Sequence, residues 1–285
     1  MVQLRHLGHL ARDVKLEHSI FALPFAYLGM ILAARGLPAL EQFAWITVAM
    51  VSARTLAMAA NRLIDRELDA RNPRTAGRAL PTGRLSPGQV LAACVVSLAV
   101  FLFAAAQLND LCLKLAPVAA AFVVGYSYTK RFTVLSHVAL GLADAIAPVG
   151  GWLAVTGSFA PEPIVLALAV ATWIGGFDVI YACQDVEFDR AHGLHSVPAR
   201  HGVATGLRVS AAMHVLTALA LLALAPLARL GVAYLVGWAI AVALLAHEHR
   251  LVRPDDLSRL GVAFFDVNGY VAIIVFVFTF AGLYV

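Results

Sequence analysis

Long apolar runs dominate this chain and decide what it can fold into. Nine runs are long enough to cross a hydrocarbon layer about 30 Å thick as helices. They lie at about residues 18–34, 42–61, 89–107, 110–127, 135–156, 163–183, 206–225, 230–246 and 261–284. Only 13% of the residues are charged, against about 25% in typical soluble domains. Because no long polar segment separates the runs, the sequence predicts an all-α, multi-pass membrane protein in which residues 1–285 form a single intramembrane domain.

Lysine and arginine are unevenly distributed between the two ends of these predicted helices. The N-terminus and the loops after the second, fourth, sixth and eighth runs carry seventeen of them, and the opposite loops carry only Arg35, Lys114 and Arg229. Positively charged loops remain on the cytoplasmic side. The pattern predicts an integral protein of a bacterial-type inner (plasma) membrane, with a cytoplasmic N-terminus and an external C-terminus. The lipid bilayer is therefore an expected partner, and no nucleic-acid partner is expected.

A first acidic segment follows the second run. Asn61, Asp65 and Asp69 succeed one another at four-residue intervals, so a helix places them on one face, together with Arg54 two turns earlier. Two carboxylates one turn apart repel each other unless a cation lies between them. Mg²⁺ suits this arrangement, because it takes one or two carboxylates together with phosphate oxygens. Four more arginines follow, and they could hold a polyanion: Arg71, Arg74, Arg78 and Arg84.

A second acidic segment repeats this pattern. In residues 184–190, Asp185 and Asp189 have the same spacing as the first pair of aspartates. Asp178 and Tyr181 precede Asp185 by two turns and one turn, so a helix places them on its face. Four predicted helices separate the two segments, an even number, and both segments should therefore open on the cytoplasmic side. We expect the rest of the chain to be the scaffold that brings them together.

Other polar residues within the apolar runs are less specific. His214 and Asn268 are interpreted as polar contacts between helices, and residues 247–250 as a solvated run of charge in a loop. Asp144 could line a cavity or pair with an arginine. Residues 148–151, Pro-Val-Gly-Gly, indicate either ordinary packing of membrane helices or a widened cavity.

Both acidic segments resemble signatures of the UbiA-type intramembrane aromatic prenyltransferases. The first combines the Asn61, Asp65 and Asp69 spacing with Asn72-Pro-Arg-Thr and Leu80-Pro-Thr-Gly-Arg. The second runs from Asp178 to Asp189, with Gly193, Ser196 and Arg200 after it. The resemblance extends to residues 17–27 and covers nearly the whole chain. It implies nine transmembrane helices around a central cavity that opens to the cytoplasmic side.

The resemblance also implies roles for individual residues. Those expected to hold Mg²⁺ and the diphosphate of a polyprenyl donor are Asn61, Asp65, Asp69, Asp185 and Asp189. Those expected to contact the diphosphate further are Arg74, Arg78 and Lys130. Those expected around the aromatic acceptor are Arg54, Tyr126 and Asp178, and Tyr181 is expected to bind substrate because it completes the polar face before Asp185. The four aspartates of the two motifs and Asp178 are the expected catalytic residues.

The implied reaction is the Mg²⁺-dependent transfer of a polyprenyl group from polyprenyl diphosphate to a small aromatic acid. The expected acceptor is 4-hydroxybenzoate or a close analogue, and the expected pathway is ubiquinone or menaquinone synthesis. Arg62 stands where ubiquinone-pathway members have aspartate, which resembles the branch described as 4-hydroxybenzoate polyprenyltransferase-like. This departure makes 1,4-dihydroxy-6-naphthoate, for menaquinone, an alternative acceptor. Haem or chlorophyll precursors are rival acceptors for the same chemistry.

A secondary transporter is an alternative of a different class, since transporters also carry intramembrane carboxylates. Their ion sites lie near the midplane on broken helices. Here the carboxylates fall at predicted helix ends beside arginines, which favours the enzyme.

Overall fold

A computed structural model describes residues 19–285, and their side chains from residue 23 onward. This part of the chain is helical and contains no β-strand, apart from an isolated bridge between Arg253 and Asp256. The all-α prediction is confirmed. The N-terminal lysine and arginines used to predict the orientation, and most of the residues from 17 to 27 used in the resemblance, have no described side chains.

Eight helices in the described part of the chain are long and apolar enough to cross a membrane. They match the second to ninth predicted runs. They are α3 (Leu40–Ile64), α5 (Pro87–Leu108), α6 (Asp110–Thr129), α7 (Ser136–Thr156), α8 (Pro161–Ala182), α11 (Val203–Leu227), α12 (Val232–Leu251) and α13 (Asn268–Gly282), which the π-helical turn η3 (Val262–Val267) precedes. The first predicted run corresponds to α2 (Ser19–Ala34), an apolar helix of 16 residues. Eight of the nine predicted spans are thus long helices in the described part of the chain, and the remaining one is described over 16 residues.

Four short helical elements follow α3 and α8. They are α4 (Arg66–Arg71) after α3, and η2 (Cys183–Asp185), α9 (Val186–Ala191) and α10 (Val197–His201) after α8. Both acidic segments of the sequence lie in these elements or at the ends of the long helices before them.

The described residues up to Leu23, together with Leu40–Tyr128, form one compact unit. Within it, α3 packs along α5, and the rings of Trp45 and Phe103 meet edge to face with 5.6 Å between centroids. Helix α5 begins at a capping box in which Ser86 and Gln89 exchange hydrogen bonds, a start that satisfies two backbone donors at once.

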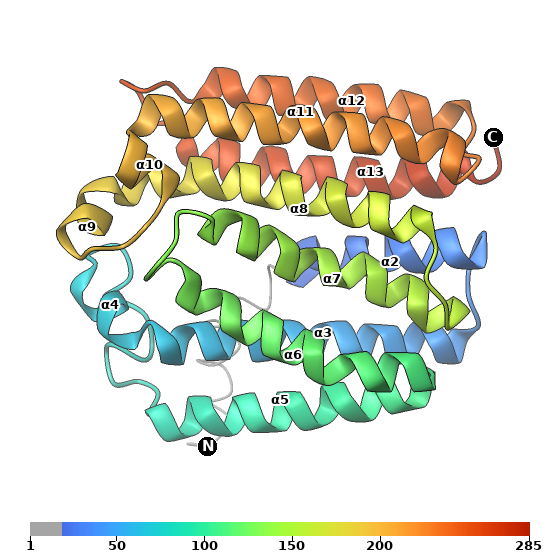
Figure 1. Cartoon of the computed structure of the whole chain (residues 1–285), viewed down its shortest axis with the longest axis horizontal. Coiled ribbons are helices and arrows are strands. Elements are labelled where there is room, and N and C mark those ends of the chain that lie inside the picture. The colour runs from blue at the N-terminus through green and yellow to red at the C-terminus, as the bar shows by residue number, and fades with distance from the viewer. Residues whose placement is uncertain (1–18) are drawn as a thin grey trace. The chain divides into compact units, whose positions relative to one another are not determined.

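Pro24–Ala39 and Thr129–Val285 form the second unit. In this unit α8 packs against α7 and against α11, and α12 packs against α13 (Figure 1). Helices α2 and α7 approach closely through Gly29 and Gly151, where an added Cβ would lie 1.9 Å and 2.1 Å from a carbonyl oxygen of the other helix. Gly151 therefore serves helix packing, the first of the two interpretations of residues 148–151. That residues 1–285 make a single domain stays a prediction.

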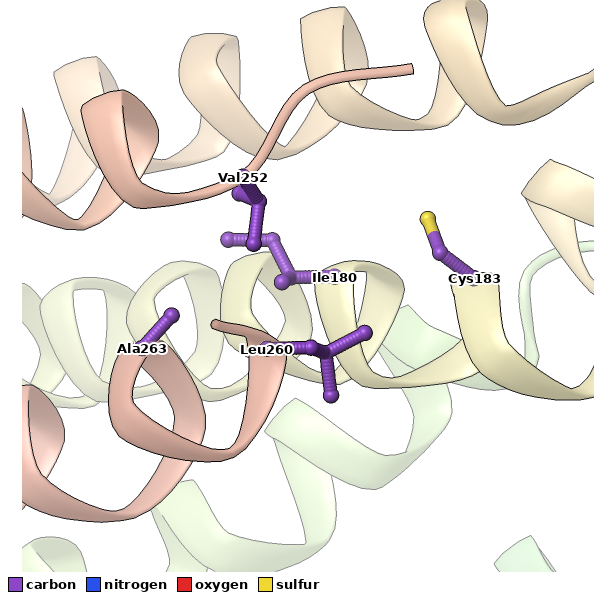
Figure 2. Close-up of a cluster of buried hydrophobic side chains, with 5 residues drawn as sticks. All are labelled: Ile180, Cys183, Val252, Leu260 and Ala263. Carbon is purple, nitrogen blue, oxygen red and sulfur yellow. The ribbon is translucent and has the colours of Figure 1, made fainter. Parts of the chain in front are cut away.

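A buried apolar cluster fixes the end of α8, just before the second acidic segment. Figure 2 shows Ile180 and Cys183 beside Val252, Leu260 and Ala263, which come from the connection between α12 and η3 and from η3 itself. Ile180 and Ala263 have no exposed surface. Because this packing holds the last turn of α8, it also sets where the chain enters the second acidic segment.

Candidate active site

The two acidic segments have the same local backbone geometry. Asp65 follows α3 and stands at the N-cap position of the six-residue helix α4, with φ −94° and ψ 5°. Asp185 ends η2 and stands at the N-cap position of the six-residue helix α9, with φ −104° and ψ 10°. Both aspartates thus adopt the sparsely populated bridge conformation in which many active-site residues are found. The repeat seen in the sequence is also a repeat in structure.

In the first segment, helical hydrogen bonds continue across the break between α3 and α4. The amide of Asp65 donates to the carbonyl of Asn61 at 2.9 Å, and the amide of Asp69 donates to the carbonyl of Asp65 at 2.8 Å. The three side chains therefore share one face, as their spacing predicts. Asp65 is 2% and Asp69 7% exposed, and buried carboxylates of this kind require partners.

Asn61 orients Asp65 in this structure. Its Nδ2 donates to Asp65 Oδ2 at 3.0 Å and to Ser127 Oγ at 3.2 Å, while its Oδ1 accepts from Arg62 Nη1 at 3.0 Å. A guanidinium can only donate, so the contact with Arg62 turns the amide NH₂ group toward Asp65. Arg62 and Ser127 are additions to the predicted site, and Arg62 is buried.

Asp69 is paired with Arg78. Arg78 Nη1 lies 2.7 Å from both carboxylate oxygens of Asp69, and Thr75 Oγ1 donates to the Asp69 carbonyl at 2.9 Å. Asn72 Oδ1 accepts a hydrogen bond from the amide of Arg74 at 2.9 Å, which shapes the loop between Asp69 and Arg78. Arg78, which is predicted to contact diphosphate, thus contacts Asp69, a predicted metal ligand. The Arg74 side chain, by contrast, is exposed.

Arg54 lies in α3, two turns before Asn61. Its Nε is buried and has no hydrogen-bond partner among the residues that the structure describes. An unpaired buried donor is costly, so this guanidinium is suited to an anionic ligand. Tyr126, in the last turn of α6 and in the same unit, is half-buried.

In the second segment, Asp189 accepts a hydrogen bond from Ser196 Oγ at 2.8 Å. Asp185 repels it and Lys130 attracts it electrostatically. The Lys130 carbonyl accepts from the amide of His195 at 2.7 Å, which holds the loop after α9 beside this lysine. Here too, two carboxylates and a cationic side chain are brought together.

Asp178 is held by a histidine that the sequence analysis did not single out. His137 Nδ1, in the first turn of α7, lies 2.6 Å from Asp178 Oδ2. One turn beyond Asp178, the ring of Tyr181 stacks on Phe264 of η3 with 4.0 Å between centroids. No sequence signal pointed to His137, because a lone histidine at the start of an apolar run has no characteristic spacing.

A further polar cluster corrects the interpretation of residues 247–250 as a loop. Helix α12 continues to Leu251, and Glu248 is fully buried. Asn268 Nδ2 donates to Glu248 Oε1 at 2.8 Å, and Trp173 Nε1 donates to Asn268 Oδ1 at 2.7 Å. His214 contacts the Trp173 carbonyl. His214 and Asn268 therefore make the interhelical contacts predicted for them.

Metal binding depends on how carboxylates are grouped. Within residues 19–285, no three or more His, Cys, Asp or Glu side chains lie in a group that could hold a metal ion. Each acidic segment supplies a pair of carboxylates with oxygen donors only, the type of ligand that Mg²⁺ prefers, and Mg²⁺ commonly completes its coordination with water and substrate phosphate. The donor set therefore fits Mg²⁺ bound together with a phosphorylated substrate.

Comparison with known proteins places the chain in a family. Residues 22–281 match the model of the UbiA prenyltransferase family. A 4-hydroxybenzoate octaprenyltransferase of Aeromonas hydrophila is 30% identical over 86% of this chain and 85% of that protein. A protoheme IX farnesyltransferase of Methylococcus capsulatus is 33% identical over 66% of this chain and 63% of that protein.

Solved structures agree. The apo structure of a UbiA homologue from Aeropyrum pernix K1 has a TM-score of 0.85 at 33% identity, covering 92% of this chain and 96% of the homologue. A UbiA homologue from Archaeoglobus fulgidus bound to GPP and Mg²⁺ has a TM-score of 0.75 at 19% identity, covering 97% and 100%, a likeness of fold. With a family match over most of its length, apolar helices and two acidic segments of one geometry, this chain belongs to the UbiA prenyltransferase family and is an integral membrane enzyme that transfers prenyl groups.

Proposed function

We propose that this enzyme transfers a polyprenyl group from polyprenyl diphosphate to 4-hydroxybenzoate or a close analogue, with Mg²⁺, in quinone biosynthesis. The observation that carries the proposal is the repeated acidic helix end, in which Asp65 and Asp185 have nearly the same backbone conformation and each begins a six-residue helix. Asn61, Asp65, Asp69, Asp185 and Asp189 are the proposed ligands of Mg²⁺ and diphosphate. A homologue of the same fold was solved with GPP and Mg²⁺, which supports a prenyl diphosphate and a metal as the ligands.

Bound Mg²⁺ supplies positive charge that stabilises the departing diphosphate, usually the dominant kind of catalysis for such a step. Arg74, Arg78 and Lys130 add positive charge on the same group. The carbon–oxygen bond to diphosphate breaks and leaves an allylic cation, which an electron-rich ring carbon of the acceptor attacks. That ring carbon then loses its proton, so the products are the prenylated acceptor, diphosphate and one proton.

Arg54 supports an acceptor that carries a carboxylate. Its buried, unpartnered Nε would be satisfied by a ring carboxylate through a charge-assisted hydrogen bond. We assign Tyr126, Asp178 and Tyr181 to the acceptor side as well. The 4-hydroxybenzoate octaprenyltransferase of Aeromonas hydrophila is matched over 85% of its length and the protoheme IX farnesyltransferase over 63%, which also favours the aromatic acid. Arg62, which donates a hydrogen bond to Asn61, stands where ubiquinone-pathway members have aspartate. Because of this difference, 1,4-dihydroxy-6-naphthoate remains the second candidate acceptor.

The test uses purified protein, Mg²⁺ and a labelled polyprenyl diphosphate with four acceptors: 4-hydroxybenzoate, 1,4-dihydroxy-6-naphthoate, protohaem, and phenol as the analogue without a carboxylate. We expect prenylation of an aromatic acid and little of phenol or protohaem. Preferential prenylation of protohaem would overturn the acceptor assignment.

The metal assignment is tested on the same assay. Asp65→Ala and Asp185→Ala should each lower turnover by at least a hundredfold, because each removes a proposed ligand, and chelation of Mg²⁺ should abolish activity of the unchanged protein. Glu67→Ala, an exposed carboxylate in α4, is the control and should keep its activity. Full turnover in chelator would refute the metal assignment.

A further inference from the structure

We propose that His137 is a positioning residue that links two carboxylates of the site, Asp178 on the acceptor side and Asp189 on the diphosphate side. The names of the two sides rest on the proposed function. The link itself rests on hydrogen bonds within the second unit, and no feature of the sequence points to it.

The two ring nitrogens of His137 contact different partners, the Asp178 carboxylate and the loop at Val197. His137 is 4% exposed; its Nδ1 lies 2.6 Å from Asp178 Oδ2, and its Nε2 lies 3.3 Å from the amide nitrogen of Val197. A backbone N–H can only donate, so Nε2 is the acceptor and Nδ1 carries the proton that is donated to Asp178. The loop at Val197 therefore fixes the tautomer that holds the carboxylate.

Ser196, the residue before Val197, binds the second carboxylate, that of Asp189. Ser196 Oγ donates to Asp189 Oδ2 at 2.8 Å and accepts from the amide of Ala199 at 3.3 Å, so it also caps α10. Ser196 and Val197 are consecutive, and their positions cannot change independently. A shift of this loop when diphosphate engages Asp189 would move the hydrogen bond that orients His137, and with it Asp178.

A packing role for His137 makes a different prediction from a positioning role. If the ring only filled space between α7 and α8, every smaller substitution would lower stability and leave the two substrates equally affected. If each ring nitrogen positions one side of the site, substitutions that keep one nitrogen should affect one substrate more than the other.

Two amide substitutions separate the nitrogens. His137→Asn places an amide near the position of Nδ1 and keeps a donor for Asp178, but loses the contact with Val197. It should raise the KM for polyprenyl diphosphate about three- to tenfold, the loss of one neutral hydrogen bond, and leave the KM for the aromatic acid within about twofold. His137→Gln reaches the position of Nε2 and should show the reverse pattern. Its KM for the aromatic acid should rise about ten- to a hundredfold, because the hydrogen bond that it loses is to the charged Asp178.

Ser136→Ala is the matched control. Ser136 precedes His137 on α7, and its Oγ donates to the His195 carbonyl of the same loop at 3.1 Å, yet it touches neither carboxylate. The KM for the aromatic acid should stay near that of the unchanged protein in this variant, and the KM for polyprenyl diphosphate should rise less than in His137→Asn. Equal changes in both KM values for the two amide variants, or unchanged kinetics in His137→Ala, would overturn the link.

Two further measurements keep this test independent of the proposed function. Mg²⁺-dependent binding of a non-hydrolysable polyprenyl thiodiphosphate should weaken in His137→Asn and not in His137→Gln, whatever the acceptor is. Failure of the unchanged protein to prenylate any aromatic acid would refute the proposed acceptor and leave this difference in donor binding intact. If the His137 variants do not accumulate, Ser196→Ala tests the link from its other end: it should weaken donor binding about tenfold, and unchanged binding would overturn the proposal.

Discussion

At the residue scale, two guanidinium groups of the first unit have contrasting surroundings. Arg78 is already paired with Asp69 through both carboxylate oxygens, whereas Arg54 has a buried Nε with no partner among the described residues. Diphosphate and metal would compete with the first interaction and a ring carboxylate would complete the second. The two arginines should therefore serve different substrates.

Kinetics of single substitutions check this assignment. Arg54→Ala should raise the KM for the aromatic acid about ten- to a hundredfold, the cost of one hydrogen bond to a charged group, with a smaller effect on the donor. Arg78→Ala should instead raise the requirement for polyprenyl diphosphate or Mg²⁺. Arg66→Ala, exposed and paired only loosely with Glu67 at 3.7 Å, is the control with unchanged kinetics. An Arg54→Ala variant altered only in its donor parameters would place Arg54 in the phosphate site.

What could be predicted for single residues depended on how local their interactions are. The shared face of Asn61, Asp65 and Asp69 follows from helical periodicity, which the sequence contains in full. The partners of His137 and Asn61 do not, because Asp178 is 41 residues from the first and Ser127 is 66 residues from the second. Such contacts arise only from packing, and they complete a site whose acidic core was visible in the sequence.

At the element scale, the lengths of the apolar runs predicted the spanning helices. Some helix ends were predicted wrongly, because the prediction places the end of a run at polar residues. The predicted eighth run stops at residue 246, yet α12 continues to Leu251, and Asn268 donates a hydrogen bond to the buried carboxyl group of Glu248 in this last part of the helix. A charged residue lowers the local hydropathy even where the fold buries it with a hydrogen-bond partner, so hydropathy alone ends the predicted helix too early. The breaks at Asp65 and Asp185 were not predicted either, since the four-residue spacing fits an unbroken helix equally well.

Two adjacent glycines of α7 give a matched test of helix packing. An added Cβ at Gly151 would lie 2.1 Å from the carbonyl oxygen of Ala26, whereas one at Gly150 would meet nothing within 4 Å. Gly151→Ala should therefore destabilise the protein by about 1–3 kcal/mol, the usual cost of overpacking. Gly150→Ala should be neutral or stabilising by up to about 1 kcal/mol, since alanine is the better helix former. Thermal unfolding in detergent measures both, and equal midpoints would contradict the close approach of α2 and α7.

At the scale of the whole molecule, the asymmetry of charge and the number of spans make one prediction together. With seventeen lysines and arginines on one side and three on the other, the segments after α3 and α8 should both face the cytoplasm. Polyprenyl diphosphate presents a highly charged head that cannot enter hydrocarbon, so the acidic segments must lie where water and Mg²⁺ reach them. Seven long helices follow the first of these segments, and if all of them cross the membrane we expect the C-terminus to lie outside.

Single-cysteine labelling in intact cells can test this orientation. The native cysteines, all free, are first replaced by serine or alanine, and one cysteine is then introduced at Gly77 or after Val285. The cysteine after Val285 should react with a membrane-impermeant maleimide. The one at Gly77, exposed in the loop after α4, should react only once the membrane is opened. Both cysteines labelling from the same side would mean that an even number of spans separates Gly77 from Val285, so that at least one of the seven long helices between them fails to cross.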